Sequence, residues 1–232
     1  MDSVDKSAPD AGLATAPIGR LGIFVKEPLA GQVKTRLCPP LSAAEAADFY
    51  RTAQAETIAR LNAGPWPVTL FYSGTESYFR RCFPGLPLVA QGAGDLGRRL
   101  QRAFATLLGE GKPAVIVGSD SPDLPLALVA EAFAALAVAE AVAAPASDGG
   151  YVLIGLRRPL PQLFADIPWS TAGVLAATRC QATAAGISWR ELGTWQDVDD
   201  FPSLLALLQR SPASASAAFV RRRLAHLLPP SP

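Results

Sequence analysis

Histidine is almost absent from the sequence. His226, close to the C-terminus, is the one histidine in 232 residues. Since histidine is the most frequent general base and a common metal ligand, its scarcity argues against a catalytic histidine and against a His-ligated metal. The chemistry that remains open to the chain is that of carboxylates, lysine and arginine.

Cysteine is scarce and scattered. Cys38, Cys82 and Cys180 lie far apart and form no CxxC pair. An odd, dispersed set of this kind argues against a disulfide framework and against a structural zinc site. We therefore expect buried thiols in a reducing compartment, and hence a cytoplasmic protein.

Neither sign of charge is in excess. The sequence has 21 basic and 20 acidic residues, a formal net charge of +1. A protein that binds nucleic acid through its phosphates usually carries a clear basic excess. We therefore expect no nucleic-acid partner, and we expect any bound anion to be small and held locally.

The sequence also lacks a leader pattern and an unbroken apolar run. Residues 1–17 are small, polar and proline-containing, so we expect a loose tail rather than a signal peptide. Glu131 and Glu140 interrupt the alanine-rich segment 131–146, which ends near Pro145. A buried helix followed by a strand fits this segment better than a membrane span.

What the sequence has instead is an alternation of strand-like and helix-like segments. Half of the residues are hydrophobic, enough for one large α/β domain, which we expect over 18–210. Expected strands cover 21–25, 68–72, 114–118, 141–144, 151–156 and 187–192. Expected helices cover 42–62 (with Ser42 and Glu45 as a capping box), 95–108, 126–138 and 172–185, and another begins at Pro202. We expect 211–232 to be a tail, in which 221–228 could form one last helix.

A basic loop follows the first expected strand. The segment KEPLAGQVKTRL sets Lys26, Lys34 and Arg36 around Gly31. Because cations and free backbone N–H groups form charge-assisted hydrogen bonds with phosphate oxygens, this loop suits a polyphosphate. It matches neither a P-loop nor a GxGxxG fingerprint. The alternative is a basic loop that is merely solvated.

An aspartate lies where the third expected strand ends. In GSDSPDLP, prolines stiffen the turn that follows Asp120. A carboxylate on a rigid element at a strand end can hold Mg²⁺, which takes oxygen ligands. The alternative is that Asp120 or Asp123 caps the next helix, and we expect Asp123 rather than Asp120 to do so.

Two adjacent glycines precede another expected strand. In SDGGYVLIGL, Gly149 and Gly150 beside Asp148 would let a ligand approach the backbone closely. A tight hairpin turn explains the same residues equally well.

An acidic cluster lies before the helix that begins at Pro202. Asp197, Asp199 and Asp200 repel one another unless a cation lies among them. Two of them could complete a metal site opposite Asp120, and the alternative role for one of the three is a helix cap.

The order of these motifs resembles a known family. It is a bacterial glycosyltransferase-like family of the nucleotide-diphospho-sugar transferase superfamily, often encoded beside radical-SAM and selenium-related genes, and the resemblance covers Gly19–Gln209. The motifs that carry it are KEPLAGQVKTRL, QGAGDLGRRL, GSDSPDLP, SDGGYVLIGL, PWST and DVDD. More distantly, KTRL and GSDSPDL are similar to phospholactate guanylyltransferases, and the D-x-P turn to molybdenum-cofactor guanylyltransferases.

The resemblance implies a GT-A fold, an α/β architecture with a mixed, mostly parallel sheet between helices and the nucleotide over the strand ends. It implies Asp120 as first metal ligand and catalytic residue, and Asp197 as second ligand. Lys34, also implied as catalytic, and Arg36 would hold the phosphates. Gly149, Gly150, Trp169, Ser170 and Thr171 would line an acceptor or sugar pocket near Asp148.

The sequence departs from related patterns at two points. The family pattern is closer to DVDT, whereas Asp200 replaces the threonine here, which leaves the choice between Asp197 and Asp199 open. The LAGGxSxRMG loop of better-understood nucleotidyltransferases is absent, so their base recognition does not transfer. The segment 92–97, with Gly94 and Asp95, is a hypothesis for that role.

These inferences lead to a transferase that depends on Mg²⁺ or Mn²⁺. Its partners would be a nucleoside triphosphate or nucleotide-sugar donor and a small-molecule acceptor. Nucleotidyl transfer is slightly preferred, because a single aspartate before x-Pro resembles nucleotidyltransferases more than the DxD of many glycosyltransferases. The alternatives are a GT-A glycosyltransferase and a nucleotide-binding protein without turnover.

Overall fold

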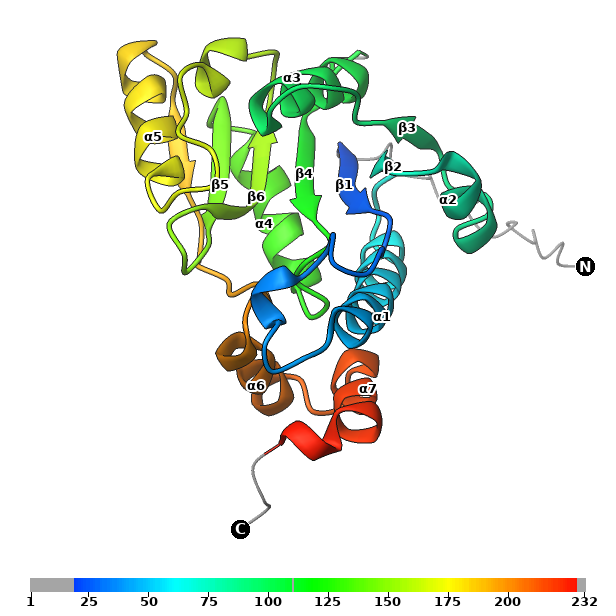
Figure 1. Cartoon of the computed structure of the whole chain (residues 1–232). Coiled ribbons are helices and arrows are strands. Elements are labelled where there is room, and N and C mark those ends of the chain that lie inside the picture. The colour runs from blue at the N-terminus through cyan, green and yellow to red at the C-terminus, as the bar shows by residue number, and fades with distance from the viewer. Residues whose placement is uncertain (1–18, 110, 229–232) are drawn as a thin grey trace, which may run out of the picture.

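A single seven-stranded sheet forms the centre of the computed structural model, which describes residues 19–109 and 111–228 (Figure 1). The tail expected over 1–17 lies outside the described residues. The strands are β1 (Arg20–Lys26), β2 (Val68–Ser73), β3 (Leu88–Ala90), β4 (Ala114–Gly118), β5 (Ala141–Pro145), β6 (Tyr151–Leu156) and β7 (Trp189–Glu191). Their order across the sheet is β3-β2-β1-β4-β6-β5-β7.

Six of these strands run parallel and β6 runs against them. β1 pairs in parallel with β2 and β4, so that Phe24 lies opposite both Phe71 and Gly118. β6 is antiparallel to β4 and β5, because only a short turn over 146–150 returns the chain from β5. The expected mixed, mostly parallel α/β sheet is confirmed.

Helices cover both faces of the sheet. The α-helices are α1 (Ala43–Asn62), α2 (Glu76–Cys82), α3 (Leu96–Leu107), α4 (Leu126–Ala135), α5 (Val174–Ala184), α6 (Phe201–Arg210) and α7 (Ala215–Arg223). Short 3₁₀ turns are η1 (Thr35–Leu37), η2 (Pro161–Phe164) and η3 (Ala225–Leu227). α1, α2 and α4 pack on one face, and α3, η2 and α5 pack on the other. Among the described residues, no helix has both the length and the apolar character to cross a membrane.

The central strand β4 is buried on both faces, as its unbroken apolar run predicts. Val115 and Val117 pack with α4 and α1, whereas Ile116 packs with α3. The start of α1 is also as expected: the hydroxyl of Ser42 accepts from the backbone N–H of Glu45, whose carboxylate accepts from the backbone N–H of Ser42.

Two short elements between β2 and α3 were not expected. α2 has seven residues and buries Phe79, and β3 has three residues at the edge of the sheet. Segments this short carry too few residues to show a helical or alternating period.

The last helix lies earlier than expected. The expectation was 221–228, whereas α7 begins at Ala215, where the hydroxyl of Ser214 accepts from the backbone N–H of Ala217. The carboxylate of Glu56 on α1 accepts from the backbone and hydroxyl of Ser216, and Val220 is buried with α1 residues. The cap and these contacts with α1 decide where the helix begins. The domain boundary near residue 210 stays a prediction.

A buried ion pair ties the loop after β4 to the end of α6. The guanidinium of Arg210 donates to both carboxylate oxygens of Asp123, at 2.6 and 3.1 Å, and also to the backbone and side-chain oxygens of Gln196. The expected cap role of Asp123 is therefore wrong, since α4 begins after Pro125 without a side-chain cap. The pair holds the segment that leads into Asp197.

Replacement of Arg210 by methionine tests this ion pair. Asp123 is 2% exposed and, among the described residues, would keep only the hydroxyl of Ser211 as a side-chain partner. We expect Arg210→Met to lower the free energy of unfolding by about 3–5 kcal/mol in urea denaturation, because it leaves a buried charge unpaired. The control Arg80→Met removes an exposed pair with Glu76 and should cost less than about 0.5 kcal/mol. Equal losses for the two variants would contradict the assigned role.

Candidate active site

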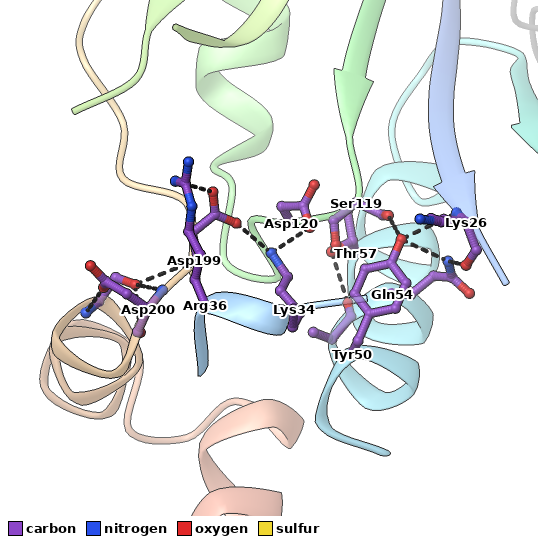
Figure 2. Close-up of polar contacts among 12 residues, drawn as sticks. Lys26, Lys34, Arg36, Tyr50, Gln54, Thr57, Ser119, Asp120, Asp199 and Asp200 are labelled. Carbon is purple, nitrogen blue, oxygen red and sulfur yellow. Dashed lines mark hydrogen bonds and ion pairs between the residues drawn. The ribbon is translucent and has the colours of Figure 1, made fainter. Parts of the chain in front are cut away.

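Lys34 lies at the junction of three loops. Its backbone has the left-handed conformation, with φ 49°. The ammonium lies 2.5 Å from Oδ1 of Asp120 and 2.8 Å from Oδ1 of Asp199, and the side chain is 4% exposed. Figure 2 shows Lys34 between the two carboxylates. Lys34 thus joins the loop after β1, the end of β4 and the segment before α6.

The charge of Lys34 is stabilised by its partners. Burial by itself lowers the pKa of the ammonium, but the charges and hydrogen bonds of Asp120 and Asp199 outweigh burial and raise the pKa above its ordinary value. Lys34 therefore stays protonated and neutralises part of the acidic charge around it.

Tyr50 on α1 forms hydrogen bonds with the segments beside this junction. Its hydroxyl lies 2.8 Å from the hydroxyl of Ser119 and accepts from the backbone N–H of Lys26 and the side chain of Gln54 (Figure 2). Burial and the charge of Asp120 raise the pKa of Tyr50 to about 12, so it stays protonated. The sequence analysis missed Tyr50 and Ser119. Tyr50 carries no signal apart from helical spacing, whereas Ser119 lies inside GSDSPDLP.

Three carboxylates form the second feature of the site. Asp148, Asp197 and Asp199 each offer an oxygen atom, and these atoms lie within 4.8 Å of one another. Burial, followed by the charge of Asp199, raises the pKa of Asp197 to about 6. A cation among the three would relieve this repulsion, and carboxylate oxygens are the ligands that Mg²⁺ and Mn²⁺ prefer. These residues fit a divalent metal.

The structure groups the aspartates of the site differently from the sequence analysis. Asp197 and Asp199 were expected near the metal, with the choice between them as second ligand open, and the structure brings both together with Asp148. Asp120 contacts Lys34, and its expected role as a metal ligand stays a prediction. Asp200 caps α6, since its carboxylate accepts from the backbone N–H of Ser203 at 2.8 Å. The cap reading is therefore confirmed for Asp200.

Three cavities meet at Asp120. The first, the loop cavity, has a volume of about 270 Å³ and is lined by the basic residues Lys26, Lys34 and Arg36. The second, the sheet cavity, has about 300 Å³ and lies over β1, β4 and β6 beside α3. The third, the Trp169 cavity, has about 610 Å³. Asp120 lines all three.

The basic loop is partly engaged with the protein itself. The ammonium of Lys26 donates to the carbonyl of Gln32 at 2.7 Å. Arg36 is 65% exposed, with its guanidinium 3.8 Å from Asp199. Gly31 is exposed with φ 74°, a turn conformation that favours glycine.

The expected pocket residues separate into two groups. Gly150, Trp169, Ser170, Thr171 and Asp148 line the Trp169 cavity together. Gly149 does not line it, because its backbone packs against the loop before α5: a Cβ there would lie 2.2 Å from the carbonyl oxygen of Ala172. The segment 146–150 also forms the tight turn between β5 and β6, so the turn reading is confirmed as well.

The segment 92–97 contributes less than expected. Asp95 caps α3 by accepting from the backbone N–H of Arg98, and the carbonyl of Gly94 accepts from Arg99. Neither Gly94 nor Asp95 lines any of the three cavities. Leu96, within this segment, lines the sheet cavity together with Gln91 just before it, and the sequence analysis missed Gln91.

The mixed, mostly parallel sheet with its antiparallel β6 is that of the nucleotide-diphospho-sugar transferase fold, as a similar solved structure shows. A Desulfovibrio desulfuricans G20 protein, provisionally named a nucleotide-diphospho-sugar transferase, matches with 29% identity and a TM-score of 0.83, over 90% of this chain and 96% of that one. Residues 57–171, just under half of the chain, match the model of a family described as "Uncharacterized protein conserved in bacteria (DUF2064)".

More distant structures share the fold alone. A cytidylyltransferase from Leptospira borgpetersenii has 11% identity and a TM-score of 0.56, over 92% of this chain and 98% of that one. Rv0371c of Mycobacterium tuberculosis H37Rv, in complex with manganese, has 20% identity and a TM-score of 0.51, over 82% and 98%. No curated protein matches the sequence. The likeness to guanylyltransferases and the gene neighbourhood stay predictions.

The raised pKa of Asp197 predicts how stability depends on pH. The unfolded chain ionises this residue near pH 4, before the folded chain does, so the folded state loses stability as the pH rises from about 4 to about 6. At pH 7 without divalent metal, Asp197→Asn should therefore have a higher free energy of unfolding than the wild type. We expect a gain of about 1 kcal/mol, reduced from the fully buried value because Asp197 is partly exposed.

Chemical denaturation at pH 7 and at pH 4 measures this gain, which should disappear at the lower pH. Addition of Mn²⁺ should stabilise the wild type more than Asp197→Asn, because the variant lacks one carboxylate of the triad. A variant no more stable than the wild type at pH 7 would show that burial and the neighbouring carboxylates do not destabilise ionised Asp197.

Proposed function

We propose that this chain is a metal-dependent transferase that takes its donor from a nucleotide. The observation that carries the proposal is the convergence of a basic cavity, a largely apolar cavity and a third, acidic cavity on Asp120. A nucleotide has a phosphate part and a planar, apolar part that would fill the first two. In open α/β sheets, ligands bind beyond the carboxyl ends of the strands, where this site lies.

The phosphates would lie in the loop cavity. Arg36 is exposed there and Lys26 reaches it, so both can form charge-assisted hydrogen bonds with phosphate oxygens. Lys34 acts chiefly by holding Asp120 and Asp199 in place, and it adds positive charge at the same point.

The base would lie in the sheet cavity. Phe24 and Leu100 line it with apolar surface, and Gln91 closes it with an amide that donates to the carbonyls of Val25 and Phe71. Because these hydrogen bonds fix the side chain, the cavity keeps its shape without a ligand.

Asp148, Asp197 and Asp199 would hold the divalent metal, Mg²⁺ or Mn²⁺. A metal bound there would withdraw charge from phosphate oxygens and so stabilise the transition state of transfer. The acidic triad is the support for this assignment, and the manganese in the Mycobacterium structure of the same fold agrees with it. Arg210 donates to the side-chain and backbone oxygens of Gln196, and these hydrogen bonds keep the next residue, Asp197, in position.

Nucleotidyl transfer is our first assignment of reaction type. In that reaction an acceptor oxygen attacks the α-phosphorus of a nucleoside triphosphate, and pyrophosphate leaves. Glycosyl transfer is the second candidate, in which a nucleoside diphosphate leaves a sugar carbon. The name of the Desulfovibrio protein supports this second candidate. The two reactions release different products, so the product identifies the reaction.

Asp120→Asn tests the catalytic role of Asp120. The amide keeps the size of the side chain, and Lys34 keeps Asp199 as its partner. We expect the rate of pyrophosphate or nucleoside diphosphate release to fall about 10²-fold or more with the fold intact, the scale for loss of one key electrostatic group. The control Asp48→Asn changes an exposed aspartate on α1 that pairs with Arg51 and should keep the wild-type rate.

An Asp120→Asn variant as fast as the wild type would contradict the role of Asp120. A wild type that binds nucleotides but releases neither product, with any mixture of acceptors, would instead favour a nucleotide-binding protein without turnover.

A further inference from the structure

The acidic lining of the Trp169 cavity restricts what can enter it. Its charged lining residues are four aspartates and one arginine, a formal charge of −3: Arg36, Asp120, Asp148, Asp197 and Asp199. The adjacent loop cavity has three cations and two aspartates, a formal charge of +1. Cations that could hold a phosphate thus gather on the donor side, and acids on the other side.

A divalent metal on the triad would not reverse this imbalance. It would bring the formal charge of the lining from −3 to −1, and the ammonium of Lys34, bound to two of these carboxylates, would offset one further charge. Arg36, the one cation of the lining, lies on the side shared with the loop cavity and 3.8 Å from Asp199. A phosphorylated or carboxylated acceptor would therefore face several carboxylates, while the nearby cations, Lys34 and Arg36, are already engaged with Asp120 and Asp199.

Trp169 adds an aromatic surface to the cavity lining. Trp169 lies against Gly97 of α3, where a Cβ would approach the indole ring to 3.0 Å. The absence of a side chain at Gly97 lets the ring pack directly on the helix, so the wall is fixed before a ligand binds. Leu96 adds apolar surface beside it.

Short polar groups complete the lining. Ser170 has φ 65°, a conformation that costs energy for a residue with a side chain, and it lies in the cavity wall with Thr171 and Gly150. Binding sites for small molecules combine an aromatic surface with a few such hydrogen-bonding groups. This combination suits a compound with hydroxyl groups and an apolar face.

We propose that the acceptor enters the Trp169 cavity, is uncharged, and reacts through a hydroxyl group. This inference rests on the proposed function, because it names the acceptor class of the same site. An acceptor hydroxyl gives its proton to a carboxylate of the cavity, and its oxygen forms the new bond to the transferred group. The bond from that group to the leaving phosphate breaks, and pyrophosphate or the nucleoside diphosphate departs with the electron pair.

The test compares acceptors in matched pairs. Each pair is a neutral hydroxyl compound and its phosphate ester: glycerol with glycerol 3-phosphate, and glucose with glucose 1-phosphate and glucose 6-phosphate. Transfer is measured on the full chain with Mg²⁺ and the nucleotide donor that it consumes. We expect kcat/KM for the neutral member to exceed that for the ester at least about ten-fold, because the ester adds a like charge to the cavity.

Variants of the wall provide a second measurement. Trp169→Ala should raise KM for the neutral acceptor about ten-fold and leave KM for the donor unchanged. Trp169→Phe keeps an aromatic wall and should restore most of the affinity. The control Trp189→Ala removes a tryptophan from the outer strand β7, away from the cavity, and should change neither constant.

The outcomes separate this inference from the proposed function. Three results would overturn the acceptor class but still be compatible with a nucleotide transferase. They are faster transfer to the phosphate esters, faster transfer to an amine than to any hydroxyl compound, and a donor KM that rises together with the acceptor KM in Trp169→Ala. A chain that neither binds nor consumes any nucleotide would overturn the proposed function, and the acceptor class with it.

Discussion

The ammonium of Lys34, held between Asp120 and Asp199, is the interaction on which the arrangement of the site depends. It joins segments that lie far apart in the sequence: the loop after β1, the end of β4 and the approach to α6. A buried ammonium is stable only when its charge is compensated, and the charges and hydrogen bonds of Asp120 and Asp199 keep it protonated. The same contact leaves Asp120 at the meeting point of the three cavities, so the ion pair fixes the place where donor and acceptor would meet.

The direction of β6 explains why Asp148 lies beside Asp197 and Asp199. Because β6 returns directly from β5, the turn that carries Asp148 lies at the same edge of the sheet as the ends of β1 and β4. The chain after β7 then places Asp197 beside Asp148, and Arg210 fixes the preceding residue. Acids gather on the β5–β7 side and cations on the β1 side. This separation of charge gives the two halves of the site different chemistry.

The sequence predicted the parts of this structure that depend on local pattern. The apolar run of β4 and the Ser42–Glu45 capping box placed a central strand and a helix start correctly. Motif positions brought Lys34 and Asp120 to one site. The role of Asp123 was mistaken because its partner, Arg210, lies 87 residues away and no local signal links them. The grouping of Asp148 with Asp197 and Asp199 depends on how two loops meet across the sheet, which spacing does not encode.

Thermal denaturation with nucleotides tests the central claim most directly. The chain would be melted with a panel of nucleoside triphosphates and nucleotide sugars, each with Mg²⁺ and with a chelator. A ligand at about 100 times its dissociation constant adds about 2.7 kcal/mol of stability, a rise of roughly 5–10 °C for a chain of this size. The account predicts such a rise with at least one nucleotide, and predicts that the chelator removes it. No rise with any nucleotide, or a rise that the chelator leaves unchanged, would contradict it.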